Sequence, residues 1–139
     1  MTIQIAGTDI IDQSRNILSS TFQNYTETVN ALGTLAAGTV NIDLSNGNVV
    51  TATLPTSGTV TFTFTTGVSS GAVSFTLYLT NPASGTPTIN WPVAVEWTRI
   101  LSFNNPPVYS TTSNKISVWS FITTNNGSKW YGALSKDNL

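Results

Sequence analysis

The sequence predicts a mainly β protein: a β-sandwich or jelly-roll-like domain preceded by an N-terminal arm and one short helix. Two observations predict it. After residue 38 apolar and polar residues alternate, which is the period of a strand. Clusters of Ser, Asn, Gly and Pro interrupt that alternation at short intervals, as turns do. A chain of 139 residues is long enough for one domain with its own core.

The N-terminal region holds the one segment with helical periodicity. Spacings of four, three, four and three residues separate Leu18, Phe22, Tyr25, Val29 and Leu32. This spacing places them on one stripe of a helix that Asp12 or Ser14 caps and Gly33 ends. The stripe is also a short heptad seam, so it predicts either packing on its own domain or an oligomerisation and attachment surface. We therefore divide the chain into an arm and helix, 1–38, and a β-sandwich, 39–139.

Every later element is predicted to be a strand. The expected strands are 39–44, 48–54, 58–66, 72–80, 87–91, 94–97, 100–103, 115–124 and 128–134. The expected turns are 45–48, 55–58, 69–71, 81–85 and 125–127. Many short strands at this spacing are typical of sandwiches and jelly rolls.

The strand 58–66 alternates threonine with larger apolar residues. We expect its apolar face and that of the following strand to point into the core: Val60, Phe62, Phe64, Phe75, Leu77 and Leu79. The threonine face is polar but uncharged, which gives weak protection against edge pairing. Such a strand is expected to lie inside a sheet or under another subunit.

The composition is poor in charge. Only 8% of residues are charged, the net charge is −1, and no charged residue lies between Asp43 and Glu96. This balance gives no electrostatic footprint for nucleic acid. The N-terminus lacks the pattern of a signal peptide and no apolar run spans a bilayer, so we expect a chain made in a cytoplasm without membrane insertion.

The side chains that catalysis needs are scarce. Without histidine or cysteine there is no imidazole base, thiol nucleophile or usual zinc site, and no disulfide. Asp43 and Glu96 are the one acidic pair available to the β domain; a glycosidase could use such a pair. The simpler interpretation is that Asp43 ends a strand and Glu96 pairs with Arg99. We predict no catalytic, cofactor or metal site, and no enzyme.

Aromatic residues gather in the C-terminal half. In the strand 115–124 both faces carry large apolar groups, with Val118 and Ile122 on one face and Trp119 and Phe121 on the other. This pattern predicts burial on both sides, in an assembly or under a loop. Trp97 and Trp119 have a second interpretation as a surface platform that stacks on sugar rings, although core or interface burial is the commoner use.

Five segments together resemble a known family. NYTETVNALG (24–33), NIDLSNGNVVTATL (41–54), FTLYLTN (75–81), INWPVAVEW (89–97) and FITTNNGSKWYGAL (121–134) are similar to a β-rich module of bacteriophage virion proteins. The module occurs in tail-fibre-like and other structural proteins of cyanophages and marine phages. The family usually has a glycine-rich turn where this chain has the segment 98–111.

The resemblance implies a non-enzymatic virion component, displayed on the particle and often oligomeric. Length favours a small capsid decoration or cement protein. The alternative is a short tail-fibre or baseplate accessory, in which Trp97, Trp119 or the 98–111 loop contacts a host-surface glycan. The expected partners are capsid or tail and baseplate subunits and copies of the chain itself, with a trimer expected by analogy.

Overall fold

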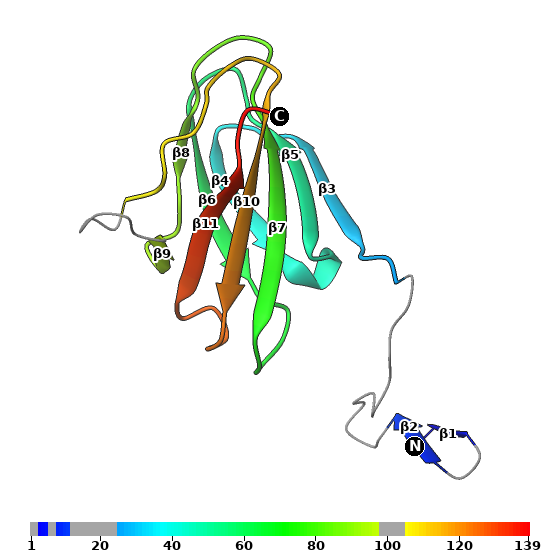
Figure 1. Ribbon diagram of the computed structural model, residues 1–139. Coiled ribbons are helices and arrows are strands. Elements are labelled where there is room, and N and C mark those ends of the chain that lie inside the picture. Colours follow the sequence, from blue (N-terminus) through cyan, green and yellow to red (C-terminus); the bar gives the residue numbers. More distant parts are fainter. Residues whose placement is uncertain (1–2, 6–7, 12–24, 98–104) are drawn as a thin grey trace.

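Figure 1 shows the computed structural model, which describes residues 3–5, 8–11, 25–97 and 105–139. These residues form a mainly β structure with a two-stranded hairpin, a six-stranded sheet and a three-stranded sheet. The strands are β1 (Ile3–Ile5), β2 (Thr8–Ile11), β3 (Val29–Thr34), β4 (Gly38–Asp43), β5 (Val49–Thr53), β6 (Thr59–Thr65), β7 (Val73–Thr80), β8 (Thr88–Asn90), β9 (Val95–Trp97), β10 (Ile116–Thr123) and β11 (Trp130–Lys136). A short 3-10 helix, η1 (Leu44–Asn46), follows β4.

The first part of the domain winds between the two sheets. Strands β3, β5 and β7 lie side by side in the six-stranded sheet, and β4, β6 and β8 form the three-stranded sheet. Because strands that are consecutive in sequence enter opposite sheets, each strand pairs with the next but one and runs parallel to it. A Greek key or jelly roll pairs its strands antiparallel, so that part of the prediction is wrong for this region.

The C-terminal strands complete the six-stranded sheet. β10 pairs antiparallel with β7 and β11 antiparallel with β10, while the short edge strand β9 runs parallel to β11. The resulting order is β3-β5-β7-β10-β11-β9. This arrangement makes β7 and β10 the central strands of the wider sheet (Figure 1).

The core lies between the two sheets. The Phe64 ring on β6 contacts Phe75, Phe121 and Trp130 on the opposite sheet, with ring centroids 5.0–5.4 Å apart. All six predicted core residues pack there: five are buried, and Phe64 is partly buried against them. The prediction of the core face is therefore confirmed, but β6 and β7 belong to opposite sheets and face each other across the core.

The predicted helix is wrong where the structure describes it. Val29 to Gly33 lie in β3, which pairs with β5, so the sheet begins on the N-terminal side of the division at residue 38. Gly33 has the positive φ (68°) expected of it, but it lies at a bulge in the strand and not at a helix end. The valine and threonines of this segment favour a strand, and the β5 backbone supplies the hydrogen-bonding partner that periodicity cannot reveal.

The remaining predicted strands from Thr39 onward agree with β4 to β11, apart from 100–103, which lies outside the described residues. Within the predicted N-terminal arm the chain forms the antiparallel hairpin of β1 and β2.

One glycine allows two loops to approach closely at the end of the sandwich. A Cβ at Gly85, whose φ is 96°, would overlap the carbonyl oxygen of Thr56, so only glycine lets these loops touch.

Candidate functional site: the outer face of the six-stranded sheet

The two tryptophans predicted to contact a ligand are core residues. Trp97 is 5% exposed and Trp119 is fully buried, so neither offers a ring face to a sugar and that prediction is wrong. The Trp119 indole N–H donates to the Ser117 hydroxyl (2.8 Å), which donates to the Leu79 carbonyl oxygen (3.3 Å). Because the indole N–H has this buried partner, the whole ring can lie between the sheets.

The predicted oligomerisation stripe does not form a single seam. Leu18 and Phe22 lie outside the described residues. Tyr25 and Val29 are exposed, whereas Leu32 packs against the core. Adjacent positions of a strand point to opposite sides, so a stripe read at helical spacing is split between the core and the surface.

Asp43 and Glu96, the acidic pair considered above, lie on different sheets. Asp43 ends β4, an edge strand of the small sheet, and Glu96 lies on β9, the far edge strand of the large sheet. Asp43 caps η1, as expected of a strand-end residue, and accepts a hydrogen bond from the Ser45 backbone N–H (2.9 Å). Hydrogen bonds from the Ser45 side chain and backbone lower the pKa of Asp43. Its role here is that of a cap.

Glu96 pairs with Lys129, a partner that was not predicted. Its carboxylate lies 2.8 Å from the Lys129 amino group, and Arg99 lies outside the described residues. The hydrogen bond and charge of Glu96 raise the pKa of Lys129. Both side chains are nearly half exposed, so the pair is a surface contact at the sheet edge.

Chemistry-bearing side chains do not gather in the part of the chain that the structure describes. Over these residues no three His, Cys, Asp or Glu side chains come close enough to hold a metal ion. Among the same residues no helix has the length and apolar content needed to cross a membrane. The candidate site is instead the outer face of the six-stranded sheet.

The outer face of the six-stranded sheet is wide and uncharged over its central strands. β7 and β10 point Ser74, Thr76, Tyr78, Thr80, Ile116, Val118, Ser120 and Ile122 away from the core, and β5 and β11 add Val49, Thr51, Thr53, Tyr131, Ala133 and Ser135. Four large side chains on this face remain exposed: Val29 (54%), Tyr78 (39%), Ile122 (45%) and Tyr131 (49%). Among the described residues of the sheet, the charged groups on this face lie at its margin, at Glu96 and Lys136.

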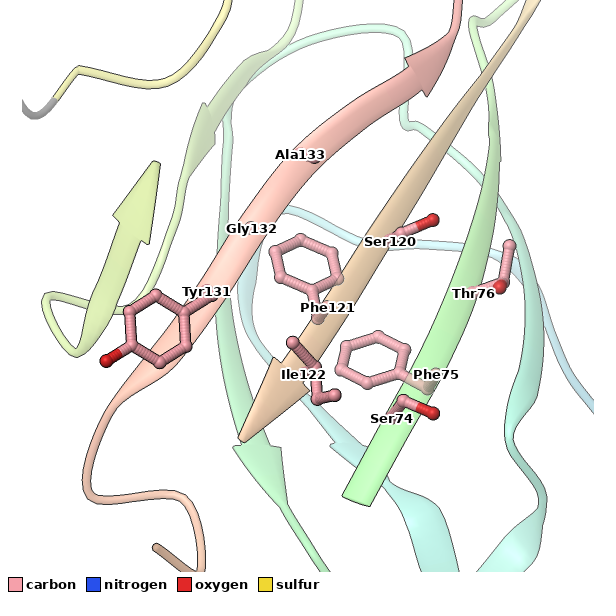
Figure 2. Close-up of a pocket in the computed structure, with 9 residues that line it drawn as sticks. All are labelled: Ser74, Phe75, Thr76, Ser120, Phe121, Ile122, Tyr131, Gly132 and Ala133. Carbon is pink, nitrogen blue, oxygen red and sulfur yellow. The ribbon is translucent and has the colours of Figure 1, made fainter. Parts of the chain in front are cut away.

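A shallow depression of about 370 Å³ lies in the middle of this face. Figure 2 shows Tyr131 at one side of it and the hydroxyls of Ser74, Thr76 and Ser120 along β7 and β10. The hollow exists because Thr76, Ser120 and Ala133, which are small, occupy one row across three strands. Next to them Ile122 and Tyr131 form a second, bulkier row. The face therefore offers both projections and a hollow, lined by apolar groups and by the hydroxyls of Ser74, Thr76, Ser120 and Tyr131.

A second cavity of about 590 Å³ lies beside β8 and β9, with Thr61, Asn90, Trp91, Val93, Trp97 and Pro106 among its lining residues. The Trp91 ring is half-buried and stacks on Phe62 at 5.2 Å. It also contacts the Trp97 and Trp119 rings. This cavity is thus an opening at the edge of the aromatic core.

Comparison with protein-family models, curated proteins and solved structures gave no match for this chain. The function of the candidate site is therefore inferred from its own residues. Sequence reasoning did not single out Tyr78 and Tyr131, although it placed apolar groups on both faces of the strand 115–124. That two-faced pattern was the available signal, because a strand with Trp119 in the core must point Ile122 away from it.

Proposed function

We propose that this protein is a non-enzymatic structural component of a bacteriophage virion, and that the outer face of its six-stranded sheet packs on a neighbouring subunit of the particle. The observation that carries the proposal is the uncharged outer face on which Tyr78, Ile122 and Tyr131 stay exposed. Protein interfaces are depleted in charge at their centre and enriched in tyrosine, and this face has both properties. The assignment of that neighbour to a phage virion rests on the resemblance of the sequence to phage virion modules.

The dimensions of the face suit such a contact. Strands about 4.8 Å apart that rise about 3.3 Å per residue give the four central strands and their two edge neighbours an outer surface of roughly 450–650 Å². A standard interface takes roughly 800 Å² from each partner, so this face supplies the larger part of one. Burying it also explains how so few charges suffice, because less of the surface meets water.

Within the particle we propose a capsid decoration or cement protein. The alternative, a short tail-fibre or baseplate accessory that binds a host glycan, has one observation in its favour. The cavity with Trp91, Asn90 and Thr61 combines a half-buried aromatic ring with polar, uncharged side chains.

The test is the copy number of the protein in purified virions, measured by quantitative mass spectrometry. Hundreds of copies per particle are expected of a decoration protein, and a few to some tens would favour the tail or baseplate. Absence from virions that are otherwise complete would overturn the proposal.

The contact face has its own test. Ile122→Lys places a charge in the middle of the face, and Val93→Lys makes the same change at a fully exposed position elsewhere. We expect both variants to fold, and only Ile122→Lys to lose binding to particles in a co-sedimentation assay. Equal binding by the two variants would show that the attachment surface lies elsewhere.

A further inference from the structure

The first turn of the parallel winding has an open edge. Among the described residues β3 pairs only with β5, and β4 pairs only with β6. The other long strands of the sandwich are paired on both sides, and the remaining edge strands, β8 and β9, have three residues each. The unpaired backbone of the sandwich is thus concentrated on β3 and β4.

The direction of the β3 backbone shows which of its groups are unpaired. The Thr28 carbonyl oxygen accepts a hydrogen bond from the Val49 N–H (3.5 Å), so Thr28 faces β5. In a parallel pair alternate residues turn both backbone groups to the same side, so Val29 and Ala31 present theirs to the open edge. Sheet edges of this kind accept further strands.

The edge has little protection against such pairing. Natural edge strands use charged residues, proline or bulges to prevent it. No charged residue and no proline lies between Thr28 and Ile42, which covers β3 and nearly all of β4. One bulge interrupts β3 between Ala31 and Gly33, and the paired length of β4 is regular. The edge is therefore open to a strand along the first half of β3.

The chain also carries strands that lack a sheet. β1 and β2 have three and four residues and pair antiparallel with each other. A two-stranded hairpin alone is marginally stable in water and gains stability when a third strand joins it. In the part of one chain that the structure describes, this hairpin and the sandwich remain separate sheets. Each of these sheets therefore has an edge that a strand of another chain can complete.

We propose that the β1–β2 hairpin of one copy adds to the open β3 edge of a second copy. The connection between β2 and β3, residues 12–28, spans at most roughly 60 Å when extended, which is enough to reach a neighbour. The edge is uncharged, so the single acidic residue of the hairpin, Asp9, meets no like charge there. Exchange repeated around a symmetry axis gives a closed oligomer. This inference is independent of the virion assignment.

The first experiment blocks the edge. Ala31→Pro removes an outward N–H without removing one that β5 uses, and Ala83→Pro makes the same change in an exposed loop. Light scattering of the full chain is expected to give a multiple of 14.8 kDa for the natural sequence and for Ala83→Pro, and about one chain mass for Ala31→Pro with unchanged far-UV circular dichroism. A monomeric natural protein, or a full-size Ala31→Pro oligomer, would overturn the proposal.

The second experiment identifies which hairpin occupies the edge and does not depend on the proline variant folding. The chain has no cysteine, so a Thr8→Cys chain can be mixed with an Ala31→Cys chain and treated with a short bifunctional maleimide. We expect crosslinks between these two chains, and several-fold fewer when Val93→Cys replaces Ala31→Cys. If crosslinks form only inside a chain that carries both cysteines, its own hairpin closes the edge and the second copy is excluded.

Discussion

The Phe62 ring lies fully buried between the sheets and stacks on Trp91 at 5.2 Å. Phe62→Ala removes that contact and leaves a cavity that surrounding strands cannot close. We expect it to lower the free energy of unfolding by about 3–5 kcal/mol, measured by urea denaturation. Thr61→Ala, on the opposite side of the same strand, should cost less than about 0.5 kcal/mol. Similar losses in the two variants would mean that the core face of β6 is assigned wrongly.

Gly132 marks the place where β11 comes closest to the aromatic core. A Cβ there would lie 2.8 Å from the Trp97 ring and 2.9 Å from a Val95 methyl group. Gly132→Ala should therefore cost about 1–3 kcal/mol through overpacking, although alanine is otherwise well tolerated in proteins. A thermal unfolding midpoint equal to that of the natural protein would show that β9 can move aside.

Tyr109 makes the free energy of unfolding depend on pH in the alkaline range. Burial of its phenol, and then the nearby Asp137 carboxylate, raise the pKa of Tyr109 above the usual 10.0. The folded state holds this proton more tightly, so its contribution is complete below pH 10 and is lost as the pH rises through the folded pKa. We expect the denaturation midpoint of the natural protein to fall more steeply above pH 10 than that of Tyr109→Phe. Parallel curves would contradict this assignment.

At the scale of elements, the packing of loops at one end of the sandwich can be isolated by a matched pair of glycines. Gly71 and Gly85 share a φ of 96°, so alanine has the same backbone strain at both. A Cβ at Gly71 meets nothing within 4 Å, whereas one at Gly85 overlaps the Thr56 backbone. Gly85→Ala should therefore be more destabilising than Gly71→Ala, by about 1–3 kcal/mol in urea denaturation. Equal costs would show that the two loops do not restrain each other.

The parallel winding explains why the open edge lies where it does. Each turn of the winding contributes one strand to each sheet, so the first turn leaves both of its strands with one neighbour. After β8 the chain leaves this scheme, and the antiparallel strands β10 and β11 continue the large sheet beyond β7. The two ends of the winding therefore differ in kind, and the first turn is the natural place for another chain to join.

For the whole molecule, the low charge predicts association that increases as the pH approaches the isoelectric point. The net charge is −1 at pH 7 and reaches zero near the isoelectric point of about 4.9. With little net charge to keep molecules apart, the uncharged outer face should then promote association. Light scattering between pH 8 and pH 4.5 is expected to show a rising apparent mass near pH 5. The apparent mass of Ile122→Lys should rise less when the two proteins are compared at the same number of pH units from their own isoelectric points. An identical rise would show that the outer face does not mediate the association.

From β4 onward, the sequence by itself determined the described strands and the core faces of β6 and β7. The period-two pattern places Phe62 inside and Thr61 outside whatever the strand pairs with, because successive side chains of a strand must point to opposite sides. Local turn chemistry likewise marked the strand ends, and Asp43 ends its strand as expected. The two apolar faces of β10 also predict burial of its outer side, which we propose is the contact with a neighbour.

The tertiary structure alone decided which strands are neighbours. The apolar spacing through Val29 and Leu32 suits a helix, and pairing with the β5 backbone makes this segment a strand. Likewise, nothing local distinguishes a parallel winding from a jelly roll, because each pairing joins residues far apart in sequence. The burial of Trp119 also depends on a distant group, since its hydrogen-bond partner Ser117 is itself fixed on the Leu79 carbonyl of the neighbouring strand. Local preferences set the direction in which each side chain points, but only long-range pairing decides what it meets.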